Sequence, residues 1–245
     1  MPGRLFTAMV LASACAVAAA AAELESPASR VTLLELYTSE GCSSCPPADR
    51  WLRELDGDER LWRDVVPVAF HVDYWDYIGW RDRFAAPEFG ERQRDYARLG
   101  GVRTVYTPGF VVNGREWRAW FRRPTLSVDR SEQVGSLRVS VEGEEAQALF
   151  EPADSPAGPL ELHVALLGFD LSTEVRAGEN RGRTLEHDFV VLGYARVPLA
   201  RSEEGYRGGF RLPAAKVPCE RKGLAVWVST RGDPRPLQAA GGWLD

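Results

Sequence analysis

The sequence predicts an α/β unit, a mixed sheet flanked by helices, over residues 30–133, followed by a mostly antiparallel, sandwich-like β-rich region over residues 134–245. In the first range, continuous apolar runs of strand length are followed by segments with helical period. In the second range, runs of strand length succeed one another between Gly, Pro and Asp turns, which is typical of antiparallel sheets.

The first unit opens with a strand and a helix that meet at a pair of cysteines. Residues 31–37, VTLLELY, form a continuous apolar run, the pattern of a strand buried on both faces. A helix is expected over residues 48–61, where apolar residues recur at helical spacing. Pro46 and Pro47 suit its first turn, which needs no amide donors. The segment between the two elements, TSEGCSSCPPAD, therefore places the cysteines at a helix N-terminus.

The other elements of the first unit are a strand, a helix and a hairpin. A second buried strand is expected over residues 65–75 and a second helix over residues 87–99. Two short β-like runs flank Asn113-Gly114, a dipeptide suited to a two-residue hairpin turn. A further helix beginning near Pro124 would close the unit.

The β-rich region contains several segments of strand length, at residues 137–152, 160–170, 184–199, 205–213 and 223–230. His163 and His187 lie among them without an obvious partner, so we expect surface groups or satisfied core groups. The loop at residues 178–185, GENRGRTL, is interpreted as a structural contact with the first unit, with a recognition loop as the alternative.

The first 22 residues have the pattern of a secretory signal peptide, with Arg4 before an apolar run and an alanine-rich end. Cleavage after Ala20 or Ala22 fits the small-residue rule. We therefore expect a periplasmic or secreted protein with no stable membrane insertion after cleavage. Cys15 lies in this segment, in a context that only loosely resembles a lipidation signal. The net charge of −5, without a basic stripe, argues against nucleic acid as a partner.

The two cysteines of the first unit can carry redox chemistry. A helix N-terminus favours the thiolate, so Cys42 is expected to attack and Cys45, one turn on, to resolve the mixed disulfide. The same spacing also fits a structural disulfide or half of a zinc site, but no second ligand pair is present in the sequence. Export favours a disulfide between them. Cys219 is then left over, and we expect a buried small apolar side chain, with an intermolecular or resolving thiol as the alternative.

Five motifs in this order carry a family resemblance: LELYTSEGCSSCPPAD, FHVDYWDYIGWRDRF, RQRDYA, VYTPGFVVNG and GENRGRTLEHDFVV. From Val31 to its C-terminus the chain resembles the secreted bacterial family called domain of unknown function 1223, itself similar to thioredoxins. The resemblance implies export, a reactive cysteine pair and a thioredoxin-like fold for residues 30–133. In such folds a cis-proline lies against the cysteines, which here is Pro108, and the preceding residue, Thr107, binds an extended substrate. Gly109 stands where relatives often have a longer polar residue.

Aromatic and titratable residues gather in HVDYWDYIGW, just after the second strand. His71 or Asp73 could shuttle protons for the thiols, and Trp75 and Trp80 could contact substrate. The alternative is aromatic packing around a hydrogen-bonded histidine with capping aspartates.

The leading functional prediction is an exported thiol–disulfide oxidoreductase that acts on protein thiols or disulfides through Cys42 and Cys45 and needs no cofactor. One alternative is a copper(I)-binding protein with Cys42, Cys45 and His71 as ligands. Another is a binding module in which the disulfide is a permanent staple. The direction of the redox reaction depends on a reduction potential that the sequence does not reveal.

Overall fold

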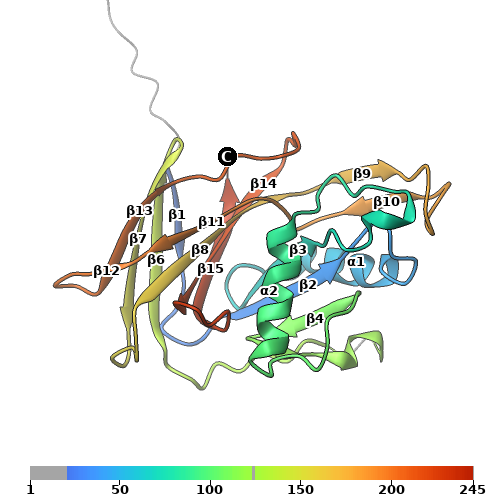
Figure 1. Cartoon of the computed structure of the whole chain (residues 1–245). Coiled ribbons are helices and arrows are strands. Elements are labelled where there is room, and N and C mark those ends of the chain that lie inside the picture. Colours follow the sequence, from blue (N-terminus) through green and yellow to red (C-terminus); the bar gives the residue numbers. More distant parts are fainter. Residues whose placement is uncertain (1–20, 123–124, 245) are drawn as a thin grey trace, which may run out of the picture.

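The computed structural model describes residues 21–122 and 125–244, and the chain is mostly β with few helices (Figure 1). The strands are β1 Ala21–Glu25, β2 Thr32–Thr38, β3 Val65–His71, β4 Gly109–Val112, β5 Arg115–Glu116, β6 Gly135–Glu142, β7 Glu145–Pro152, β8 Leu160–Gly168, β9 Leu171–Glu174, β10 Thr184–His187, β11 Val190–Pro198, β12 Ala200–Arg201, β13 Tyr206–Arg211, β14 Lys222–Thr230 and β15 Pro236–Leu244. The helices are α1 Pro46–Arg53 and α2 Pro87–Arg98, with 3-10 turns at Glu54–Gly57, Asp76–Ile78 and Arg118–Arg122.

The strands form three sheets. The largest is mixed and has eight strands in the order β15-β14-β8-β11-β3-β2-β4-β5. In it β2 and β11 run parallel to β3, and the other neighbours are antiparallel. A five-stranded antiparallel sheet has the order β1-β6-β7-β13-β12, and β10 pairs with β9. The eight-stranded sheet therefore takes strands from both predicted ranges and joins them where β11 meets β3.

Several predicted elements are confirmed because their signals are local. The strand over residues 31–37 corresponds to β2, and the helix over residues 87–99 to α2. The hairpin turn falls at Asn113 and Gly114, whose φ angles of 46° and 82° are both left-handed, as a tight two-residue turn requires.

Other boundaries differ from the prediction. The first helix has Pro46 and Pro47 in its first turn, as expected, but it ends at Arg53 and continues only as a 3-10 turn to Gly57, short of the expected end at Leu61. The second strand ends at His71, because residues beyond it turn into the Asp76–Ile78 3-10 segment. The helix expected near Pro124 is wrong for residues 125–133, which are not helical, while Pro124 itself lies outside the described residues.

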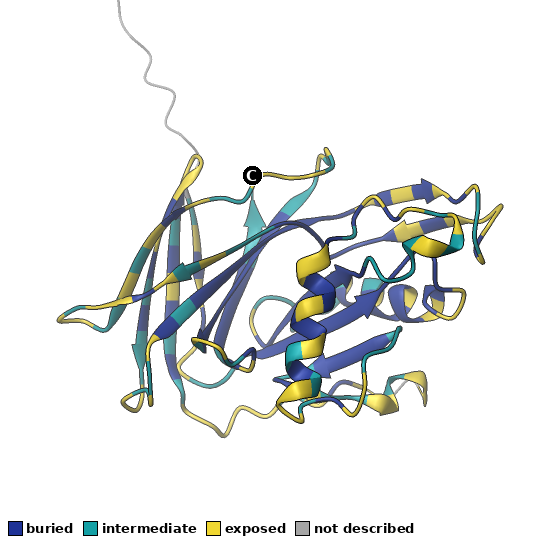
Figure 2. Ribbon diagram, viewed as in Figure 1, coloured by how far each residue is buried: buried dark blue, intermediate teal, exposed yellow. Residues whose placement is uncertain are grey.

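The five-stranded sheet packs on one face of the large sheet, so the predicted sandwich-like arrangement is present (Figure 2). Alternate residues of β14 show how both faces of that strand are buried. Val226 and Val228 contribute to the core between the two sheets, whereas Ala225 and Trp227 contribute to the core on the opposite face. Strands β1 and β15 were not predicted, because β1 coincides with the expected end of the leader and β15 carries two glycines.

Most of the predicted leader, residues 1–20, lies outside the described residues. Ala21 and Ala22 pair with Glu142 and Val141 of β6. Within the part of the chain that the structure describes, no helix is long and apolar enough to cross a membrane.

A buried ion pair fastens α2 to the sheet. The Arg92 guanidinium donates to both carboxylate oxygens of Glu35 on β2, at 2.8 and 3.0 Å. The Tyr96 hydroxyl donates to the same carboxylate, and Arg92 also donates to the Pro234 carbonyl at 3.1 Å. Glu35 is fully buried and Arg92 is 6% exposed, so each charge depends on the other for solvation.

Glu35→Gln should lower the free energy of unfolding by about 3–5 kcal/mol, because it leaves the Arg92 charge buried and unpaired. Urea denaturation would measure the loss. Asp95→Asn, which breaks the exposed Asp95–Arg98 pair of the same helix, is the control and should cost less than about 1 kcal/mol. Equal losses in the two variants would contradict this account.

Candidate functional site

The two cysteines lie in the loop that connects β2 to α1. They form the predicted disulfide, with Cα atoms 5.4 Å apart. Cys45 is the N-cap residue of α1, and Pro46 and Pro47 occupy the first helical positions. The Cys42 N–H donates to the Ser39 carbonyl at 3.1 Å, which tightens the loop.

Burial differs sharply within this short motif. Cys42 and Cys45 are 1% and 0% exposed, whereas Ser43 and Ser44 between them are exposed. The Ser44 hydroxyl lies 3.3 Å from the sulfur of Cys42. The exposed serines therefore form the part of the motif that another molecule meets first.

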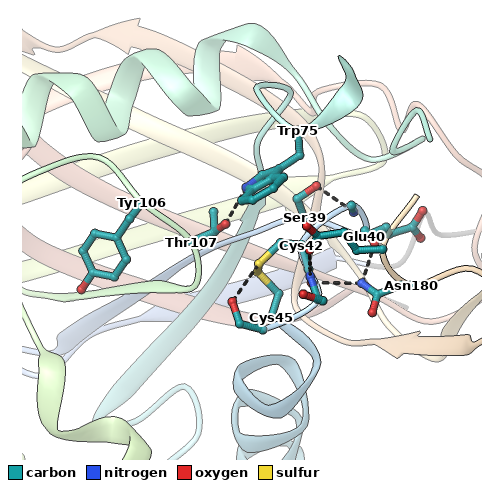
Figure 3. Close-up of a disulfide and its surroundings, with 12 residues drawn as sticks. Ser39, Glu40, Cys42, Cys45, Trp75, Tyr106, Thr107 and Asn180 are labelled. Atoms are coloured by element: carbon teal, nitrogen blue, oxygen red, sulfur yellow. Dashed lines mark hydrogen bonds between the residues drawn. A yellow bond between two sulfur atoms is a disulfide. The ribbon is translucent and has the colours of Figure 1, made fainter. Parts of the chain in front are cut away.

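The Thr107–Pro108 peptide bond is cis, the isomer expected from the resemblance. The Trp75 indole N–H donates to the Thr107 hydroxyl at 2.7 Å, and Figure 3 shows this pair next to the disulfide. Helix α2 holds the segment that carries Thr107, since the Gln93 side chain donates to the Tyr106 carbonyl at 2.7 Å. Thus Trp75 and Thr107 come together at the cysteine pair.

Two other predicted residues lie apart from this arrangement. The Trp80 indole N–H donates to the Glu40 carboxylate at 2.8 Å, so Trp80 supports the cysteine loop from its upstream side. The Asp73 carboxylate lies beside Gly90 of α2. Neither residue has a described hydrogen bond to Cys42 or Cys45.

His71 is buried at the end of β3 and pairs with Asp82. Its Nδ1 lies 2.7 Å from the Asp82 carboxylate, and both side chains are essentially inaccessible. Burial lowers the pKa of His71, but the charge and hydrogen bond of Asp82, together with the charges of Asp49 and Glu40, outweigh burial and the net shift is upward. For Asp82, burial raises the pKa and the His71 charge lowers it, with a net shift downward. The two form a buried, hydrogen-bonded histidine–aspartate pair.

A buried polar cluster surrounds this pair, made of Glu40, Asp49, His71, Asp82 and His187. The rings of His71 and His187 have centroids 5.0 Å apart, and His187 Nε2 lies 3.5 Å from the Glu40 carboxylate. Among the described residues, His71 Nε2, one Glu40 oxygen and both His187 nitrogens have no hydrogen-bond partner. Such atoms are costly to bury, so the cluster is a place where stability is lost.

Asp49 connects the cluster to Cys45 and to solvent. It is four residues after Cys45, and its N–H donates to the Cys45 carbonyl at 3.1 Å, so the two side chains share one face of α1. Burial raises the pKa of Asp49, although His187 and His71 oppose the shift. Asp49 and His187 also line a cavity of about 80 Å³ between α1 and β10.

The loop that precedes β10 reaches back to the cysteines, as predicted for GENRGRTL. The fully buried Asn180 side chain donates to the carbonyls of Glu40 and Cys42 at 2.8 and 3.0 Å (Figure 3). Its own carbonyl accepts from Arg183 at 2.7 Å. The neighbouring Glu179 carboxylate accepts from the Ser43 N–H at 3.0 Å.

Sequence reasoning missed Glu40, Asp49 and Asp82 as parts of the site. The position of Asp49, one helical turn after Cys45, was the available signal. The expectation of a satisfied or exposed side chain is wrong for His187, whereas His163 does bond to Tyr194 and Ser229.

Cys219 is partly exposed and not fully buried as expected. It packs against an apolar cluster that includes Phe84. Burial raises the pKa of its thiol. In residues 21–122 and 125–244, no group of three or more His, Cys, Asp or Glu side chains is placed to hold a metal ion.

The fold and this site define a mostly β protein with a Cys-x-x-Cys disulfide at the N-terminus of a short helix. The family described as Protein of unknown function (DUF1223) matches residues 33–229. The chain belongs to this family, as the five motifs indicated.

Two solved structures are similar to this chain. Protein AGR_C_4864 from Agrobacterium tumefaciens is 26% identical with a TM-score of 0.58, and the match covers 88% of this chain and 94% of that chain. HBP35 of Porphyromonas gingivalis is 14% identical with a TM-score of 0.54, over 89% of this chain and 76% of that chain, a likeness of fold alone. No curated protein is significantly similar to this chain.

Asn180→Ala should lower the free energy of unfolding by about 1–3 kcal/mol, because two carbonyls of the cysteine loop lose their donor. Urea denaturation measures this loss. Arg181→Ala, an exposed neighbour in the same loop, should change stability by less than about 0.5 kcal/mol. A loss no larger than that of Arg181→Ala would show that the Asn180 contacts do not hold the loop.

Asp49→Asn should change how stability depends on pH. A carboxyl whose pKa is raised on folding favours the folded state below its unfolded pKa, and this contribution is lost as pH rises through the folded pKa. The asparagine variant escapes that loss, so its stability relative to the wild type should increase as pH rises above about 4. Urea unfolding over a pH series tests this, and parallel curves for the two proteins would contradict it.

Proposed function

We propose that this protein is an exported, thioredoxin-like thiol–disulfide oxidoreductase that acts on protein thiols or disulfides through Cys42 and Cys45. The observation that carries the proposal is the disulfide closed across two residues at the N-terminus of α1, directly after the buried strand β2. The cis Thr107–Pro108 bond beside it supports a thioredoxin-like arrangement.

The proposed reaction exchanges one disulfide for another. A substrate thiolate attacks the sulfur of Cys42, the Cys42–Cys45 bond breaks, and Cys45 leaves as a thiolate. A second substrate thiolate attacks the mixed disulfide and releases Cys42, so the substrate dithiol is oxidised while the protein is reduced. The reverse sequence reduces a substrate disulfide and oxidises the protein.

The two cysteines differ in a way that fits these roles. Cys42 precedes the exposed serines, and the Ser44 hydroxyl and the helix dipole of α1 can stabilise its thiolate. Cys45 lies on the helix face that carries Asp49. We assign Asp49 as the group that exchanges a proton with Cys45, with the adjacent cavity as the route to solvent.

Substrate contact is assigned to Trp75 and Thr107, because these residues lie beside the disulfide and Trp75 orients the Thr107 hydroxyl, and to Pro108, which follows Thr107 through the cis bond. Trp80 is instead assigned to support of the cysteine loop through Glu40. His71 is assigned to the buried polar cluster, where it pairs with Asp82. Asp73 is assigned no role in the reaction, because its carboxylate lies beside α2.

Export to the periplasm or the medium is part of the proposal. The leader-like first 22 residues support it, and a disulfide persists in such oxidising compartments.

One observation favours a second candidate, a binding module with a permanent disulfide. Both cysteines are at most 1% exposed, so an attacking thiolate reaches Cys42 only after a local opening of the loop. The reduction potential separates the candidates, since a value above about −250 mV indicates a labile pair and one below about −300 mV a structural bond. The copper alternative has no comparable support, because Cys42, Cys45 and His71 do not form a metal-holding group among the described residues.

Cys42→Ser should abolish disulfide exchange with a model protein substrate, because the attacking sulfur is lost. Cys45→Ser should instead accumulate a mixed disulfide that non-reducing electrophoresis and mass spectrometry detect. Cys219→Ser serves as the control and should retain exchange. Exchange that persists in Cys42→Ser would contradict the mechanism.

A further inference from the structure

A carboxylate from the C-terminal half of the chain sits on the backbone of the cysteine loop. Glu179 Oε2 accepts the Ser43 N–H at 3.0 Å, and Ser43 directly follows Cys42. The contact joins residues 136 positions apart in the chain. Asn180, next to Glu179, is fully buried and donates to the carbonyls of Glu40 and Cys42. These bonds fix the position of Glu179 relative to the cysteine loop.

The Ser43 N–H belongs to the peptide unit that directly follows Cys42, where it would otherwise be able to stabilise negative charge on the loop. The helix dipole at the start of α1 favours negative charge there, although Pro46 and Pro47 have no N–H and the Ala48 and Asp49 amides donate to the Cys45 carbonyl. When Glu179 takes this amide, the Cys42 thiolate is left with the Ser44 hydroxyl, 3.3 Å away in the disulfide form. The carboxylate also brings its own negative charge to the peptide unit that joins Cys42 to Ser43.

Glu179 remains charged at neutral pH and is not neutralised by a cation. Hydrogen bonding to Ser43 lowers the pKa of its carboxyl group. Among the described residues no ion pair involves Glu179, and the nearest described guanidinium contact in this loop, that of Arg183, goes to the Asn180 carbonyl.

The other titratable groups that face the cysteine loop are buried. They are Glu40 in the loop itself, Asp49 on α1, His71 on β3, Asp82 in the segment after β3, and His187 on β10. His71 and Asp82 are paired with one another. Glu179 is the exposed charge that bonds directly to the backbone between the two cysteines.

We propose that Glu179 is a redox-tuning residue: by occupying the Ser43 amide and repelling negative charge at Cys42, it disfavours the Cys42 thiolate and makes the pair more reducing. The inference rests on the proposed thiol–disulfide exchange. It makes the C-terminal half of the chain a functional part of the redox site. Reduction potentials rise when the reduced dithiol form is stabilised, so removal of Glu179 should make the pair more oxidising.

The test compares Glu179→Gln, which keeps an acceptor oxygen but loses the charge, with Glu179→Ala, which loses both. Glu174→Gln is the matched control, since Glu174 is an exposed residue of β9 with no described hydrogen bond to the cysteine loop. All variants carry Cys219→Ser. Each is equilibrated in glutathione buffers and its alkylated thiols are counted by mass spectrometry, and the pH dependence of Cys42 alkylation is recorded.

In Glu179→Gln the equilibrium should shift toward the reduced form by about 1.5- to 5-fold, the range for exposed charge pairs, and a fivefold change corresponds to about 20 mV. The midpoint of Cys42 alkylation should move to lower pH. Glu179→Ala should shift both quantities at least as far. High salt should reduce the difference between variant and wild type in both the redox equilibrium and the alkylation midpoint, because salt screens the Glu179 charge. A purely structural effect of the loop would not depend on salt in this way.

If Glu179→Gln matches Glu174→Gln and the wild type in both measurements, the inference is overturned while the proposed exchange stands. The inference is also overturned, and the proposed exchange still stands, if salt does not change the shift and Glu179→Gln loses stability in urea by the same free energy as the redox shift. The loop contact would then be structural. If the wild-type pair does not equilibrate with glutathione at all, the proposed function and this inference fail together.

Discussion

The buried Glu35–Arg92 pair is the constraint on which the rest of the site depends. It holds α2 against the sheet at a position where Glu35 is fully buried and Arg92 is only 6% exposed. One residue further along the same helix, Gln93 fixes the Tyr106 carbonyl and accepts the Tyr74 hydroxyl. The segments that carry Trp75 and Thr107 are therefore placed by a helix whose own position is set by a buried ion pair.

The C-terminal half of the chain completes this site. Strand β11 continues the eight-stranded sheet directly beside β3, and the residues just before it form β10 and the loop that carries Asn180. This arrangement brings His187 over the end of β3 and Asn180 over the cysteine loop. Burial of Glu40 and His71 is a consequence, since both lie beneath these segments.

The buried polar cluster breaks the rule that buried polar atoms find hydrogen-bond partners. Within the described part of the chain, neither His187 nitrogen and only one Glu40 oxygen has a hydrogen bond, although His187 Nε2 lies 3.5 Å from the other Glu40 oxygen. Violations of this kind concentrate at functional sites, where stability is given up for reactivity. The cluster lies behind the face of α1 that carries Cys45 and Asp49, which is where a redox cycle would need groups that exchange protons.

The sequence by itself determined the features that depend on local signals. The run VTLLELY, the prolines after Cys45 and the Asn113-Gly114 turn each specify their structure within a few residues, and the cysteine pairing follows from a spacing of three. Only the tertiary structure decided the partners of the cysteine loop. Asn180 and Glu179 reach it across more than 130 positions, and such contacts depend on how β11 joins β3, which no local pattern records.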